Sequence, residues 1–170
     1  MSNPARAWRH AYAATSSLWA GALPLAAAAH EGWWGSAATA WSWLAYAVGA
    51  IVCHQRSERS FHLATTPLPV CARCTGLYLG AALVALCVTG RSPRLPAPPS
   101  RGLVWLVAAA GPTVATLVFE WTTGVTPSNL ARAACGLALG GSVSWLIVAA
   151  LAGDDERTGL AGPWPSSRSE

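Results

Sequence analysis

Cys71 and Cys74 are the residues whose types and spacing point most directly to chemistry. They lie three positions apart in "PVCARCTG", at the predicted start of a helix, so their sulfurs face the same side of the chain. Helix N-terminal N–H groups and the neighbouring Arg73 both favour a thiolate there. A thiolate is a metal ligand and also a nucleophile, so this CxxC pair alone indicates either a metal site or a redox site.

Cys53 and His54 supply a second pair of metal-ligating groups, at the predicted end of the preceding helix. The loop 53–74 is short enough to bring both pairs together. Three cysteines and one histidine form a common tetrahedral zinc shell. The sequence therefore predicts a zinc site made of Cys53, His54, Cys71 and Cys74, with His62 as a spare ligand.

A membrane thiol–disulfide oxidoreductase is the main alternative, with Cys71 and Cys74 as the catalytic pair. Cys53 would then be a third, resolving thiol, and a quinone or a protein thiol would be the partner. A plain structural loop, whose cysteines do neither, is the remaining interpretation. Whether the protein is an enzyme stays open at this point.

Charged residues near the predicted helix ends form a second group, consisting of Arg59, Arg73, Glu120 and Arg132. Charges near membrane depth tend to face the bundle interior and to pair. They are either interfacial, with Arg132 snorkelling, or an interior pair that supports the thiol loop or relays ions. The relay would suit a small transporter or an assembly factor. Three polar residues are expected to support the site: Gln55, Tyr78 and Asn129.

The composition places these residues in a membrane protein. The chain has 170 residues, of which 53% are hydrophobic and only 11% charged, and its mean hydropathy is +0.37. Soluble domains carry about a quarter charged residues. The net charge of +4 comes from scattered arginines that form no basic patch, which excludes a nucleic-acid partner and leaves the lipid bilayer.

Five charge-poor stretches have lengths near the roughly 20 residues that cross a bilayer. We expect an all-α, multi-pass helical bundle over residues 1–153 in the cytoplasmic membrane, with four or five spans, and a polar, disordered tail over 154–170. The expected spans are about 11–29, 36–53, 74–90, 102–121 and 131–152.

The first stretch has a second interpretation, as a signal peptide that ends in small residues. With five spans the arginines divide equally between the two faces, and we expect a cytoplasmic N-terminus. Two GxxxG pairs, Gly76/Gly80 and Gly136/Gly140, allow close helix contact. We expect this contact within one bundle, in preference to a homo-oligomer.

The string CHQ…RSF…PVCARCTGLYLG, with "TPSNLARAACGLALG" downstream, resembles a family of unknown function made of small multi-pass membrane proteins from bacteria and archaea. The resemblance covers residues 52–151, and Glu120 stands where an acidic residue is expected. It implies a membrane helical fold and carries no established activity. It also implies that Glu120, Asn129 and Arg132 belong with the thiol loop.

Overall fold

The structure, a computed structural model, describes residues 4–89 and 102–160, with side-chain environments up to residue 151. Five α-helices account for nearly all of it, and a short 3-10 turn (Ser57–Arg59) and a small hairpin interrupt the loop between the second and third. The elements are α1 (Pro4–His30), α2 (Ser36–Val52), β1 (His62–Leu63), β2 (Thr66–Pro67), α3 (Ala72–Thr89), α4 (Gly102–Thr123) and α5 (Asn129–Leu160). The predicted all-α membrane bundle is confirmed.

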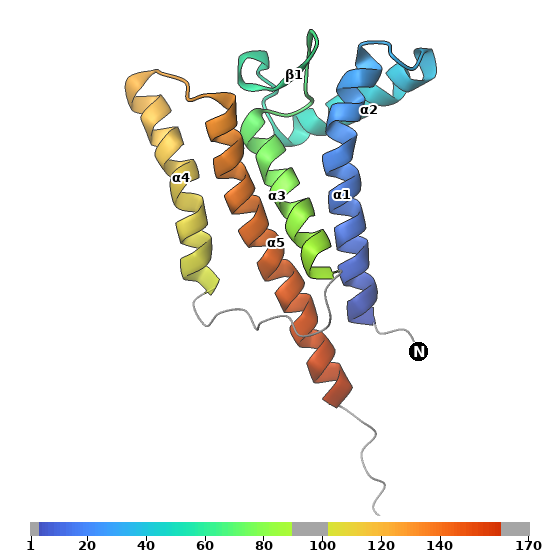
Figure 1. The fold of residues 1–170 in the computed structure, drawn as a ribbon, viewed down its shortest axis with the longest axis vertical. Coiled ribbons are helices and arrows are strands. Elements are labelled where there is room, and N and C mark those ends of the chain that lie inside the picture. The colour runs from blue at the N-terminus through green and yellow to red at the C-terminus, as the bar shows by residue number, and fades with distance from the viewer. Residues whose placement is uncertain (1–3, 90–101, 161–170) are drawn as a thin grey trace, which may run out of the picture.

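Four long helices run side by side, and α5 packs against α1, α3 and α4 (Figure 1). The short helix α2 lies at one end of this bundle, together with the hairpin, in which His62 pairs with Pro67 and Leu63 with Thr66. The first helix, α1, begins at the opposite end. The loop that carries the cysteine motif is therefore held at one end of the bundle, which we call the motif end.

The contact between α3 and α5 depends on glycine on both helices. A Cβ at Gly76 would overlap the carbonyl oxygen of Ala133, and a Cβ at Gly140 would overlap that of Leu77. Gly80 and Gly136 are equally crowded by the facing backbone. The two GxxxG pairs therefore pack within one bundle, as the sequence predicted.

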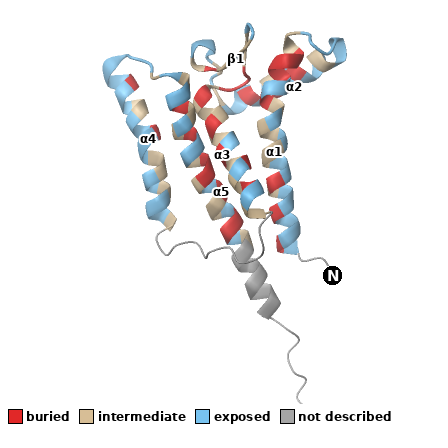
Figure 2. Cartoon of the chain, in the orientation of Figure 1, coloured by how far each residue is buried: buried red, intermediate tan, exposed pale blue. Residues whose placement is uncertain are grey.

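The outer surface is apolar, as expected for contact with lipid. Within residues 4–89 and 102–160, three helices are long and apolar enough to cross a membrane: α3, α4 and α5 up to Leu151. Most of α4 is exposed (Figure 2), including Trp105 near its start and Trp121 near its end. Exposed tryptophans also lie near the start of α1, at Trp8, and around the start of α2. Tryptophan at both ends of a bundle is typical of the two membrane interfaces.

The helix bounds can be compared with the expected spans. The helices at Ser36–Val52, Ala72–Thr89 and Gly102–Thr123 begin and end within two residues of the stretches predicted for them. The first helix starts earlier than expected, at Pro4. The last continues to Leu160, inside the segment expected to be a disordered tail, and residues 161–170 lie outside the described part of the chain.

Candidate functional site

Local structure puts the three motif cysteines at helix ends. Cys53 is the residue that caps α2, in extended backbone conformation, and its N–H donates to Gly49 O at 2.9 Å. Cys71 directly precedes α3, and Cys74 lies in the first turn of that helix. Thr75 completes this turn, because its N–H and hydroxyl both donate to the carbonyl of Cys71. Each thiol is therefore held by a defined piece of backbone.

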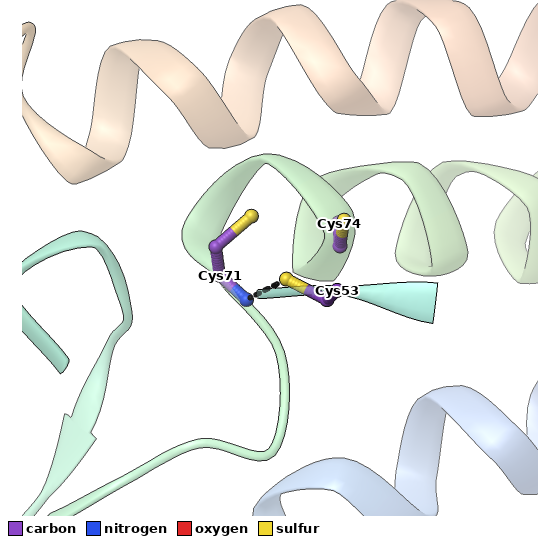
Figure 3. Close-up of side chains that lie close together, drawn as sticks. All are labelled: Cys53, Cys71 and Cys74. Carbon is purple, nitrogen blue, oxygen red and sulfur yellow. Dashed lines mark hydrogen bonds between the residues drawn. The ribbon is translucent and has the colours of Figure 1, made fainter. Parts of the chain in front are cut away.

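The three sulfurs converge on one point. The Sγ atoms of Cys53, Cys71 and Cys74 all lie within 4.8 Å of one another, and each residue is partly buried (Figure 3). The backbone N–H of Cys71 also donates to Cys53 Sγ at 3.2 Å. All five cysteines of the chain are free thiols. We call these three residues the thiol group.

The position of Cys53 relative to Cys71 is fixed by Gln55. Its Nε2 donates to Tyr46 O at 2.6 Å and to Pro69 O at 2.7 Å, so it joins α2 to the loop segment that leads into α3. Gln55 adopts a positive φ of 48°, which is uncommon for a residue with a side chain. Gly49 leaves room for this bridge, because a Cβ there would meet both Gln55 Nε2 and Pro69 O.

A second anchor joins the loop to α5. Asn129 Nδ2 donates to Ser60 O at 2.9 Å, and Ser60 is fully buried. Asn129 therefore supports the loop, as the sequence suggested, but it does so through a backbone carbonyl and not through a cysteine.

One side of the thiol group is apolar. Leu23, Ala27, Leu68 and Val70 form a buried cluster from α1 and the loop, and Cys53, Cys74 and Tyr78 pack against it. The Tyr78 ring also meets Trp19 edge to face, with ring centroids 6.0 Å apart. This cluster excludes water from the side of the sulfurs that faces α1.

The other side of the thiol group is a cavity of about 550 Å³. All three cysteines line it, together with apolar residues from α2 and α4 and with four arginines. The lining residues are Val52, Cys53, His54, Gln55, Arg56, Arg59, Cys71, Arg73, Cys74, Leu117, Trp121 and Arg132. Arg56, Leu117 and Trp121 are parts of the site that the sequence did not single out.

A buried carboxylate is shared by two of these arginines. Glu120 Oε1 lies 2.6 Å from Arg59 Nη2, and Arg132 Nη2 lies 3.0 Å from each Glu120 oxygen. Glu120 and Arg132 are both buried, whereas the Arg59 side chain is about one-third exposed at 34%. Arg132 is therefore an interior residue paired with Glu120 and does not snorkel to the interface.

Arg73 takes a different partner. Its Nη2 donates to Thr116 Oγ1 at 3.2 Å, and within the described residues it belongs to no ion pair. Thr116 had not been singled out from the sequence. Its position four residues before Glu120 would have placed both on one face of α4.

Cys71 has the electrostatics of a reactive thiol. A hydrogen bond from the Cys74 thiol stabilises the Cys71 thiolate and, with N–H groups of Arg73 and Cys74, lowers the pKa of Cys71 to about 5, although burial opposes the shift. A thiol with such a pKa is ionised at neutral pH. Cys71 is therefore ready to ligate a metal or to act as a nucleophile.

The two histidines are placed differently from the thiols. His54 is exposed and lines the cavity, and in the part of the chain that the structure describes the group of converging metal-ligating atoms contains only the three sulfurs. His62 lies on β1, where its Nε2 is 3.1 Å from Ser57 Oγ. Their roles as ligands stay predictions.

These features define an all-α membrane protein with a partly buried thiol group at one end of its bundle. Residues 53–146, more than half of the chain, match the family described as "Predicted membrane protein (DUF2085)", and the chain belongs to it. The resemblance noted from the sequence, to a membrane family of unknown function, is thus confirmed.

Two curated archaeal proteins, both uncharacterised, are similar over short stretches. One from Methanothermobacter thermautotrophicus is 53% identical over 30 residues, which are 18% of this chain and 27% of that protein. One from Methanocaldococcus jannaschii is 49% identical over 35 residues, which are 21% of this chain and 22% of that protein. The chain thus aligns with about a quarter of the length of these relatives. No solved structure matches it.

Proposed function

We propose that Cys53, Cys71 and Cys74 bind a transition-metal ion, with zinc as the metal. The observation that carries this proposal is the convergence of three free thiols within 4.8 Å. Zinc–sulfur bonds of about 2.3 Å in a tetrahedron put sulfurs about 3.8 Å apart, so small side-chain movements would complete the shell. A disulfide joins two sulfurs and would leave the third unused.

The surroundings of the thiol group support metal binding. Zinc takes cysteine as the thiolate, and Cys71 is already ionised at neutral pH. The N–H of Cys71 donates to Cys53 Sγ, and such outer hydrogen bonds orient a ligating sulfur. His54 or a ligand from the cavity would supply the fourth donor.

Metal content tests the proposal. Protein purified in neutral detergent should carry about one zinc per chain by elemental analysis, and Cys71→Ser should lose it, because a serine hydroxyl is a poor zinc ligand at neutral pH. Cys87→Ser is the matched control, since Cys87 lies on α3, the helix that follows Cys71, is exposed and is not in the thiol group. Wild-type protein without zinc would contradict the proposal.

A thiol–disulfide oxidoreductase is the second candidate function, favoured by the low pKa of Cys71 beside Cys74 at the start of α3. In this reaction the two thiols lose two electrons and two protons and form one S–S bond. A quinone that becomes a quinol, or a protein disulfide that becomes two thiols, would accept them. A metal-free protein in which a reductant raises the titratable thiols of the group from one to three would support this function over the first.

A further inference from the structure

We propose that the cavity beside the thiol group binds a phosphate group, carried either by a free phosphate compound or by the headgroup of an anionic lipid. The inference deepens the proposed function, because it assigns the ligand class of the same site. It also has a basis of its own, in the four arginines that line the cavity: Arg56, Arg59, Arg73 and Arg132.

The positive charge in the cavity exceeds what the protein neutralises. Arg59 and Arg132 share the single carboxylate of Glu120. Arg73 has a hydroxyl partner, Thr116, and no ion pair in the described ranges 4–89 and 102–151. Arg56 has an ion pair with Glu58, in which Nη1 and Oε1 are 4.0 Å apart. Both side chains are exposed, so this pair neutralises little of the charge in the cavity.

A bound metal does not remove this excess. Zinc with three thiolates carries one negative charge, Glu120 carries another, and the four guanidiniums carry four positive charges, which leaves an excess of about two. The dianion of inorganic phosphate or of a phosphate monoester balances that charge, and the phosphodiester of a lipid headgroup balances half of it. A guanidinium group binds two phosphate oxygens through two parallel N–H···O hydrogen bonds. A single hydroxyl oxygen, such as that of Thr116, cannot accept both of these hydrogen bonds in the same geometry.

Unused hydrogen-bond donors point to the same ligand. The Nε atoms of Arg59, Arg73 and Arg132 are buried and have no hydrogen-bond partner among the described residues. Buried donors are normally satisfied, so these three arginines keep hydrogen-bonding capacity that no described protein acceptor uses, and the same arginines line the cavity. Arg73 and Arg59 come from different segments, the start of α3 and the motif loop, and both reach the space beside the sulfurs.

The position of the cavity suits either source of phosphate. It lies at the motif end of the bundle, where exposed Trp121 also lines its wall. Tryptophan at this depth is typical of the headgroup region, where anionic lipids and soluble phosphates both have access. The two sources are therefore separated by experiment.

The test uses protein purified in neutral detergent, which is titrated with inorganic phosphate in a calorimeter. The same protein is also placed in nanodiscs with and without phosphatidylglycerol, and its thermal unfolding is measured in both. We expect saturable binding of one of the two probes. Arg73→Gln should weaken this binding at least tenfold, while Arg73→Lys should retain part of it. Arg6→Gln, on the exposed start of α1 at the other end, should leave it unchanged.

Each outcome has one meaning. Phosphate binding in detergent identifies a soluble compound, and stabilisation by phosphatidylglycerol alone identifies a lipid headgroup. Absence of both, or equal losses in Arg73→Gln and Arg6→Gln, would overturn the inference. Zinc is measured in every sample, so a protein that binds phosphate without zinc sinks the metal proposal and leaves the phosphate site standing.

Discussion

Among the single residues of the site, Glu120 has the largest electrostatic role. It is the only acidic side chain buried in the described part of the chain, and it joins Arg59 from the loop to Arg132 from α5. A buried charge is tolerated when it is paired, and removing one partner leaves the other charge uncompensated. Glu120 therefore holds together two arginines that would otherwise repel each other.

Glu120→Gln should destabilise the protein by about 3 kcal/mol, the lower end of the range for breaking a buried pair, because Arg59 is partly exposed. Thermal unfolding in detergent measures the change. Glu58→Gln is the control, and this exposed residue should change stability by less than about 1 kcal/mol. Equal losses of stability in Glu120→Gln and Glu58→Gln would show that the buried ion pairs of Glu120 do not stabilise the protein.

At the scale of elements, the packing of α3 on α5 decides whether the site assembles. Arg73 and Cys74 come from the start of α3, and Asn129 and Arg132 from the start of α5. The glycines that bring these helices into contact begin one turn further along, at Gly76 and Gly136. The close contact therefore aligns the two helix starts beneath the loop.

Gly76→Ala should cost about 2–3 kcal/mol, because the added methyl group overlaps the backbone of Ala133 and one helix must move away. The same substitution should reduce zinc content, since the start of α3 shifts with the helix. Gly21→Ala on α1 is the matched control, because nothing lies within 4 Å of the methyl group it adds. It should keep or slightly raise stability. If Gly76→Ala were as stable as Gly21→Ala, the contact between α3 and α5 would not be tight.

For the whole molecule, the position of α2 changes how charge is distributed between the two ends. With α2 at the motif end, we expect α1 to cross the membrane beside α3, α4 and α5, the three helices that are long and apolar enough to do so. The motif end then has Arg56, Arg59, Arg73 and Arg132, three of which belong to the site around Glu120. The other seven arginines lie in the first turns of α1, in the linker between α3 and α4, or towards the C-terminus. The positive-inside rule then predicts that the motif end faces away from the cytoplasm.

Labelling with a membrane-impermeant maleimide in intact cells measures this orientation. Glu58→Cys, exposed on the motif loop, should react more than the wild-type chain before the cells are opened. Ser92→Cys, in the linker between α3 and α4, should react only afterwards. The reverse pattern would place the site in the cytoplasm, where thiols are kept reduced and the oxidoreductase function would be disfavoured.

The sequence by itself determined the class of protein and predicted the residues of a candidate site. Long apolar stretches with few charges can bury their backbone only as helices in lipid, and this local property fixed most helix bounds within two residues. The CxxC and the Cys-His pair at the ends of two such stretches are also local features. They were enough to predict one split site, of which the structure brings the three cysteines together.

Only the tertiary structure decided how these parts meet. A 17-residue apolar helix such as α2 satisfies its backbone either across a bilayer or at its surface, so its direction depends on long-range contacts such as the Gln55 bridge. The pairing of Arg132 with Glu120, and of Arg73 with Thr116, likewise depends on how helices rotate about their axes. The sequence showed which groups were present, and the packing of α3 and α5 decided which side chains face the sulfurs.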